Sequence, residues 1–154
     1  MKIAIVSDSH NMSPFALRNA AAALKPHHVD LLVHLGDGCE DVTLLAKELG
    51  VPCHAVKGNC DFAPDIAKEI VLPIKGRRIL ICHGHEHTVK MSLMRLYLRA
   101  QEVKADIALY GHTHYQRADQ EGNILLLNPG ALMNRRYALV EIEGQNVSHT
   151  LLND

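Results

Sequence analysis

The chain has 154 residues, enough for one domain, and a chain of this length buries roughly 68 to 70% of its unfolded surface. Its 16 Lys and Arg against 17 Asp and Glu give a formal net charge of -1 with no long run of one sign. This balance argues against a nucleic-acid-binding surface or a dedicated binder of anionic membranes. No apolar stretch approaches the roughly 18 residues needed to span a bilayer, so we expect a cytoplasmic protein.

The sequence holds no internal repeat, low-complexity segment or linker, so we expect residues 1–154 to form a single domain. Its four cysteines form no C-x-x-C pair, and we interpret them as small buried hydrophobic side chains. They are Cys39, Cys53, Cys60 and Cys82. The 11 His outnumber the 2 Phe and 4 Tyr together, which indicates a metal or acid–base site.

The first half of the chain predicts strands that alternate with helices. A β-branched run at residues 2–7 is typical of a strand buried on both faces. Ser13, with proline after it, predicts the start of a helix. Residues 29–35 and 51–57 predict the next two strands, and the helix between them is expected to end at Gly50.

Further strands and one more helix are expected up to residue 110. Residues 68–74 and 77–82 predict two strands joined as a hairpin. Thr88 is expected to cap a third helix, followed by a buried strand at residues 105–110. The residues of that helix expected to pack in the core are Met91, Met94 and Leu98.

The pattern changes after residue 110. Turns at residues 121–122 and 143–144 separate short apolar runs with no helical stretch between them, which predicts antiparallel hairpins. The chain before them predicts βαβ units with right-handed crossovers. The expected fold class is therefore α/β.

Five predicted strands run directly into polar residues that can bind metals. The groups are Asp8-Ser9-His10, Gly36-Asp37, Gly58-Asn59-Cys60-Asp61, His83-Gly84-His85 and Gly111-His112-Thr113-His114. Because parallel strands of one sheet place their carboxyl ends along one edge, we expect these groups to converge at one rim. Asp, Asn and His together suit divalent cations of the Mn, Fe, Ni or Zn kind, so the sequence predicts a metal site.

The spacing within these groups supports a shared site. Asp8 and His10 skip one residue, as do His112 and His114, so in an extended chain each pair faces the same way and can bind adjacent ions. Glycine directly precedes Asp37, Asn59 and His112. A residue without a side chain lets the backbone approach a small site closely at these positions.

This order of motifs, completed by Asn128-Pro129-Gly130, resembles the calcineurin-like metallophosphoesterase superfamily. The length and lack of insertions resemble its small single-domain prokaryotic phosphodiesterase branch, which also contains the eukaryotic retromer subunit. The resemblance spans nearly the whole chain and implies a four-layer α/β/β/α sandwich of two mixed sheets with two metal ions at its rim. It implies one ion held by Asp8, His10 and His114, and another held by Asn59, His83 and His112, with Asp37 bridging both.

Two divalent cations suit hydrolysis of a phosphate ester because they clamp the attacking and leaving oxygens and lower the pKa of bound water from 15.7 to about 7. Two divalent cations carry four positive charges, and Asp8, Asp37 and a bridging hydroxide each carry one negative charge. The site therefore keeps a net charge of about +1, which attracts an anionic phosphate. We therefore predict a dinuclear phosphodiesterase that acts on a small phosphoester by attack of that hydroxide, with Asp37, Asn59 and His112 among its catalytic residues. Manganese is the expected metal, with iron, nickel or zinc as alternatives.

Two positions depart from the family pattern. Larger members carry a His after Gly-Asn that is assigned the protonation of the leaving oxygen, and Cys60 stands there in this chain. We expect His85 to take over that role as the general acid. Ala131 stands where the family usually has Ser, which removes a hydroxyl from the site.

Other functions remain open on the sequence alone. The same ligands suit a phosphomonoesterase or nucleotidase, and the same fold suits a non-catalytic protein-interaction scaffold. Exposed edge strands of the C-terminal hairpins also leave a homodimer open.

Overall fold

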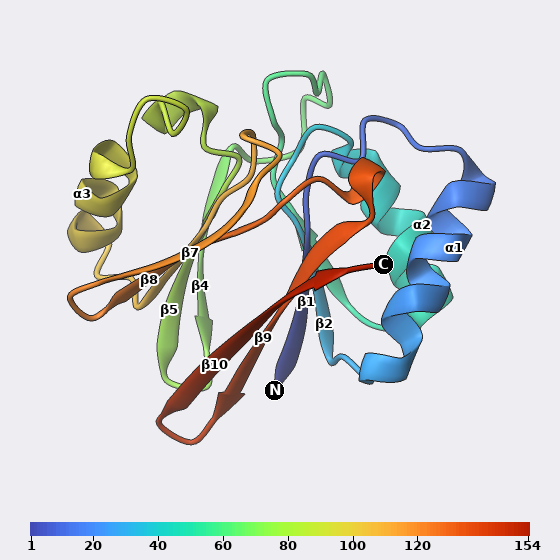
Figure 1. Cartoon of the computed structure of the whole chain (residues 1–154). Helices are drawn as coiled ribbons and strands as arrows, with labels where there is room; N and C mark the ends of the chain where they lie inside the picture. The colour runs from blue at the N-terminus through green and yellow to red at the C-terminus, as the bar shows by residue number, and fades with distance from the viewer.

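The computed structural model describes all 154 residues. Two five-stranded sheets pack face to face, with α1 and α2 covering the outer face of one sheet and α3 lying outside the other (Figure 1). Both sheets mix parallel and antiparallel pairs. The predicted α/β class and the implied α/β/β/α sandwich of two mixed sheets are therefore confirmed.

The first sheet has the strand order β10-β9-β1-β2-β3. Its strands are β1 Lys2–Val6, β2 Leu31–His34, β3 Cys53–Ala55, β9 Arg136–Glu143 and β10 Asn146–Asn153. Its helices are α1 Pro14–Leu24 and α2 Val42–Leu49, with the 3-10 turns η1 Lys25–His27 and η2 Cys39–Asp41. Because β1, β2 and β3 run parallel, their carboxyl ends point to the same side of the molecule.

The second sheet has the strand order β4-β5-β6-β8-β7. Its strands are β4 Glu69–Ile74, β5 Arg77–Cys82, β6 Ile107–Leu109, β7 Gln116–Glu121 and β8 Ile124–Pro129. The remaining elements are α3 Met94–Glu102 and the 3-10 turns η3 His85–His87 and η4 Leu132–Asn134. Here β5, β6 and β8 run parallel, so the sheet again gathers several carboxyl ends on one side.

The main core lies between the sheets. It is a cluster of 16 buried apolar residues drawn from both sheets, including Ile5 of β1 and Ile81 of β5. Smaller clusters of 13 and 10 buried residues lie beneath the helices, around Leu45 of α2 and Leu96 of α3 respectively. Full burial of each such side chain stabilises the folded state by about 1.5 to 3 kcal/mol, so the core holds the strand ends in fixed positions.

The first helix begins and the second helix ends where the sequence predicts. The Ser13 hydroxyl accepts a hydrogen bond from the Ala16 amide at 3.2 Å and caps α1. α2 ends at Gly50, which takes the left-handed conformation with φ 69°. No helix is both long enough and apolar enough to cross a bilayer.

The prediction for the third helix was wrong at its start and on its buried face. Thr88 ends the turn η3 in the left-handed region, and α3 begins later, at Met94. Met91, Met94 and Leu98 are exposed, whereas Leu96 and Ala100 are buried. Apolar residues repeat at helical spacing on both faces of this segment, so the period alone does not identify the face that packs on the sheet.

Candidate metal centre

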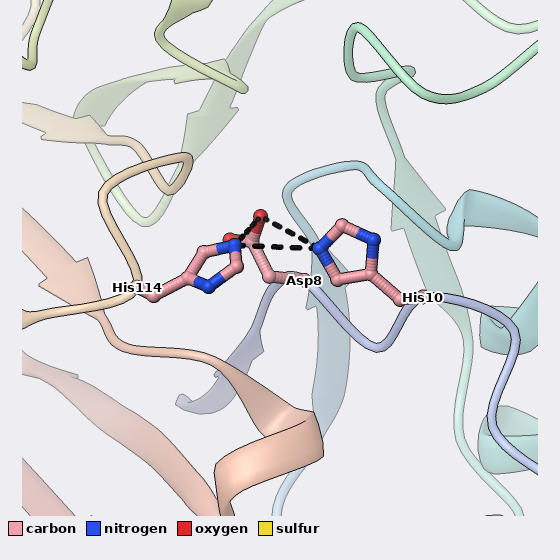
Figure 2. Close-up of side chains that lie close together, drawn as sticks. All are labelled: Asp8, His10 and His114. Atoms are coloured by element: carbon pink, nitrogen blue, oxygen red, sulfur yellow. Dashed lines mark hydrogen bonds and ion pairs between the residues drawn. The ribbon is translucent and has the colours of Figure 1, made fainter.

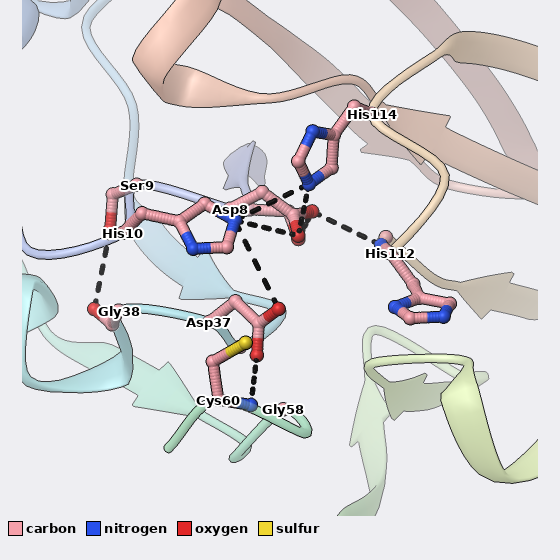
Figure 3. Close-up of polar contacts among 12 residues, drawn as sticks. Asp8, Ser9, His10, Asp37, Gly38, Gly58, Cys60, His112 and His114 are labelled. Atoms are coloured by element: carbon pink, nitrogen blue, oxygen red, sulfur yellow. Dashed lines mark hydrogen bonds and ion pairs between the residues drawn. The ribbon is translucent and has the colours of Figure 1, made fainter.

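The polar groups that follow the strands do converge, but they come from both sheets. Asp8 and Asp37 follow β1 and β2 of the first sheet, and His83 and His112 follow β5 and β6 of the second. Figure 3 shows the loops that carry Asp8, Asp37 and His112 facing one another around a common centre. The site therefore lies where the carboxyl ends of two sheets meet, instead of along the edge of one sheet as predicted.

Asp8, His10 and His114 form the first group of metal-ligand atoms (Figure 2). Oδ1 of Asp8 lies 3.2 Å from Nε2 of His114 and 3.7 Å from Nε2 of His10. The two imidazole nitrogens are 3.3 Å apart. Ligands bound to one divalent ion at about 2 Å lie roughly 3 to 4 Å from one another, so the three atoms have the spacing of a cation site.

A second group consists of Asp37, His83 and His112. Oδ2 of Asp37 lies 3.3 Å from Nε2 of His83 and 4.0 Å from Nε2 of His10, so the same carboxylate oxygen borders both groups. Its other oxygen, Oδ1, accepts a hydrogen bond from the Cys60 amide at 2.8 Å (Figure 3). This bond fixes the carboxylate and leaves Oδ2 directed at the space between the groups.

Two buried atoms of the centre have no hydrogen-bond partner, namely Oδ1 of Asp8 and Nε2 of His83. A buried polar atom without a partner costs about 1 to 3 kcal/mol, and a bound ion would remove that cost. Nδ1 of His83 lies 2.8 Å from the Leu35 carbonyl oxygen, to which it donates, so Nε2 presents its lone pair to the centre. The donor set therefore fits a divalent metal ion.

Ionisation in the centre follows from burial and from the two carboxylates. Burial acts to lower the pKa of His83, but the contact with Asp37 and the charge of Asp8 outweigh it and raise this pKa. Burial acts to raise the pKa of Asp37, but the contacts with His83 and the Cys60 amide hold it well below its usual range. The pKa of His112 falls to about 4 because of burial and the positive charges of His83 and Lys90. A neutral His112 keeps a lone pair for a metal.

The ligand loops are not extended, contrary to the prediction made from the one-residue spacing. Asp8, His10, His112 and His114 have φ angles of 53°, 49°, 70° and 66°, in the left-handed region. Asp8 and His10 still reach the same group, but His112 and His114 lie in different groups. This conformation costs about 1 to 2 kcal/mol at each non-glycine residue, and such strain gathers at functional sites.

Two glycines allow the loops to approach, as the sequence predicts. A Cβ atom on Gly58 would lie 2.7 Å from the Asp37 amide nitrogen, and one on Gly111 would lie 2.8 Å from Oδ2 of Asp8. Both distances are too short for a real side chain. The absence of a side chain at these positions therefore lets the backbone close around the centre.

Asn59 and His85 lie beside the two groups. The Asn59 side chain is exposed, and its amide nitrogen donates a hydrogen bond to Sγ of Cys60 at 3.5 Å and none to a predicted ligand. The His85 ring centroid lies 5.4 Å from that of His83 and 6.1 Å from that of His112. Nδ1 of His85 is buried without a partner, and burial together with His83 lowers the pKa of this ring.

Cys60 was not among the predicted metal ligands, and its interpretation as a buried hydrophobic residue was wrong. Cys39 and Cys82 are buried, but Cys60 is exposed and its sulfur lies within 4.8 Å of ligand atoms of His10 and Asp37. Partial desolvation of the sulfur and the charge of Asp37 raise the pKa of Cys60, so the thiol stays protonated at neutral pH.

Asp61 lies in a motif that the sequence singled out, but its role was missed. Its carboxylate accepts hydrogen bonds from four backbone amides, those of Asp37, Gly38, Cys39 and Gly58, at 2.7, 2.8, 3.2 and 2.8 Å. It thereby joins the loop after β2 to the loop after β3. Spacing in the sequence carries no signal for such a role, because the bonds go to backbone atoms.

Asn128 holds the loop after β6 in a similar way. Its side-chain amide donates to the Gly111 carbonyl and to the Thr113 hydroxyl, both at 3.0 Å. Its carbonyl oxygen accepts the Gly130 amide at 2.9 Å. The Asn-Pro-Gly motif therefore positions the ligand histidines without entering either group.

A four-layer sandwich with two His/Asp groups at the meeting of its sheets defines the metallophosphoesterase class of proteins. The chain belongs to the calcineurin-like phosphoesterase superfamily, whose domain model matches residues 1–145.

The chain is similar to curated members of this superfamily and to a solved structure. It is 36% identical to the probable metallophosphoesterase YsnB of Bacillus subtilis over 93% of this chain and 85% of the relative. It is 28% identical to phosphodiesterase MJ0936 of Methanocaldococcus jannaschii over 84% of this chain and 83% of the relative. A conserved protein of Streptococcus pneumoniae, described as a predicted phosphoesterase, superimposes with a TM-score of 0.81 at 31% identity, covering 99% of this chain and 88% of that one.

Proposed function

We propose that the protein is a dinuclear metal-dependent phosphodiesterase. The observation that carries this proposal is the position of Asp37, whose one free oxygen borders both ligand groups. Asp8, His10 and His114 form one group of ligand atoms, and Asp37, His83 and His112 form the other. In this assignment each group holds one ion, Asn59 is added to the second ion, and Asp37 is shared. Two bound divalent cations, with manganese expected, would activate water and offset the negative charge of the phosphate.

The protein's own contribution is to hold the donor atoms before any ion binds. Oδ2 of Asp8 is occupied by the Ser7 hydroxyl at 2.6 Å and by the His112 amide at 3.1 Å, which leaves Oδ1 for the centre. Asp37 is held in the same way by the Cys60 amide. Each carboxylate thus has one oxygen fixed by the protein and one free. Asn59, which is exposed in the loop after β3, would have to turn its side chain inward to complete the set in this assignment.

His85 is assigned the protonation of the leaving oxygen. It is the ionisable side chain beside the His83 and His112 rings that belongs to neither ligand group. Burial and the charge of His83 lower the pKa of His85, so its protonated form is scarcer than that of an ordinary histidine. Esters with good leaving groups should therefore react faster than alkyl esters.

Two observations favour a diester substrate over a monoester. A relative of this chain is named phosphodiesterase. The side chains of His10 and His114 are 31% and 38% exposed, so the centre is open enough for a phosphate with two ester groups. The test is hydrolysis of bis-aryl and mono-aryl phosphate by protein loaded with each metal in turn. Faster turnover of the diester supports the proposal, and faster turnover of the monoester identifies a phosphomonoesterase. No hydrolysis of either ester with any metal would favour the scaffold function.

A further inference from the structure

Two hollows are lined by residues next in sequence to predicted ligands, namely Cys60 after Asn59 and Thr113 between His112 and His114. One, of about 290 Å³, adjoins Cys60 and includes Glu40 and Phe62. The other, of about 400 Å³, is here called the Lys90 hollow, and its walls include Val89, Lys90, Leu93, Thr113, Tyr115 and Arg117. Figure 3 shows Cys60 and the His112–His114 loop on opposite sides of the Asp8 and Asp37 carboxylates. A phosphodiester carries two ester substituents, here called its arms, and each hollow could bind one of them.

The two hollows carry free charges of opposite sign. Lys90 is exposed and takes part in no ion pair. Arg117, in the same hollow, is matched by Asp119, which accepts hydrogen bonds from it at 2.7 and 3.2 Å. Across the centre Glu40 is exposed and has no ion-pair partner. An arm with a second negative charge is therefore attracted to the Lys90 hollow and repelled from the other.

The walls of the Lys90 hollow suit a planar group. The Tyr115 side chain is 72% exposed, so its ring is available for stacking, while Val89 and Leu93 supply apolar surface. Thr113 forms the edge nearest the metal centre, because it lies between two ligand histidines and its hydroxyl is bonded to Asn128. A volume of about 400 Å³ lies within the range of small-molecule sites, which is about 300 to 1,000 Å³.

We propose that the Lys90 hollow binds the ester arm that carries both an aromatic ring system and a second anionic group. A dinucleotide with a terminal phosphate belongs to this substrate class, because the terminal nucleotide supplies a base for Tyr115 and a charge for Lys90. The inference rests on the proposed phosphodiesterase function and adds a substrate class to it.

The experiment measures kcat/KM of the manganese-loaded full chain for deoxyadenosine dinucleotide with and without a 5′-phosphate. The wild-type protein is expected to prefer the phosphorylated form. Lys90→Gln is expected to lower this preference roughly five- to tenfold, mainly through KM, and the difference should fade as salt is added. Lys90→Arg, which keeps the charge, should retain most of the preference.

Matched variants distinguish a specific effect of the Lys90 hollow from the general effect of losing one positive charge. Lys47→Gln removes the same charge from the exposed face of α2 and should leave the preference as it is. Tyr115→Ala should reduce kcat/KM for both dinucleotides relative to bis(p-nitrophenyl) phosphate. No preference in the wild type, or the same preference in Lys90→Gln, overturns the inference while leaving the proposed function intact. Failure of the wild type to hydrolyse bis(p-nitrophenyl) phosphate overturns the proposed function, and this inference with it.

Discussion

Removal of the Asp61 carboxylate should unlink the two loops that carry Asp37 and Asn59. Oδ2 of Asp61 accepts the Asp37 and Gly58 amides, and Oδ1 accepts those of Gly38 and Cys39. A hydrogen bond to a charged group contributes about 1.5 to 3 kcal/mol, and water replaces part of what is lost. We therefore expect Asp61→Ala to lower the free energy of unfolding by about 3 kcal/mol.

Asp61→Asn tests whether both oxygens are needed. The amide keeps one acceptor oxygen but turns its NH2 group toward two backbone amides, so the variant should lose nearly as much stability as Asp61→Ala. For a chain of this length, about 3 kcal/mol corresponds to a fall in Tm of roughly 6 to 12 °C. Calorimetry of the metal-free protein measures this fall, and titration with manganese should show at least a tenfold loss of affinity.

The stability that the Asp61 carboxylate contributes should decrease at low pH. Burial acts to raise the pKa of Asp61, but the four amide bonds outweigh burial and lower it. A lowered folded-state pKa means that the stabilisation is complete above the unfolded pKa of about 4 and is lost as the pH falls below it. The stability difference between wild type and Asp61→Ala should therefore be constant near neutral pH and should shrink below about pH 4.

Asp65→Asn is the matched control, because Asp65 is exposed in the same loop. It should change the free energy of unfolding by less than about 0.5 kcal/mol. An Asp61→Asn protein as stable as this control, with unchanged manganese affinity, would refute the reasoning about the loops.

Three further outcomes follow from the centre. Asp37→Ala should lose metal and turnover together, because it borders both ligand groups; elemental analysis that finds two ions on an active variant contradicts this. His85→Ala should slow alkyl phosphodiesters at least tenfold more than bis-aryl phosphate, and steady-state rates showing equal losses would remove His85 as the acid. Gly111→Ala should cost about 1 to 3 kcal/mol because its methyl group overlaps Asp8 and Ser7, and an unchanged midpoint in a denaturant titration would contradict this.

The sequence predicted well those features that depend on local chemistry. Ser13 before a proline marked the start of α1, Gly50 marked the end of α2, and β-branched runs marked the buried strands. The strand-end groups were also found from sequence, because ligand types placed directly after apolar runs are rare without a shared site. The resemblance to a known family then supplied the two-sheet arrangement.

Features that depend on the other sheet or on backbone atoms could not be predicted. The apolar stripe of Met91, Met94 and Leu98 has helical spacing, yet the opposite face, with Leu96, packs on the sheet. The ligand residues have left-handed backbone conformations, which Asp and His adopt more readily than most residues, but the sequence does not show which Asp and His residues adopt them. The four amides bound by Asp61 have no sequence signature at all.

The central claim, that Asp37 is shared by a pair of ions, is tested most directly by anomalous diffraction from crystals grown with manganese. Two anomalous peaks about 3.5 to 4 Å apart are expected, with an Asp37 oxygen between them and with Asp8 and His83 on opposite ions. A single peak, or two peaks with no carboxylate in common, would contradict it.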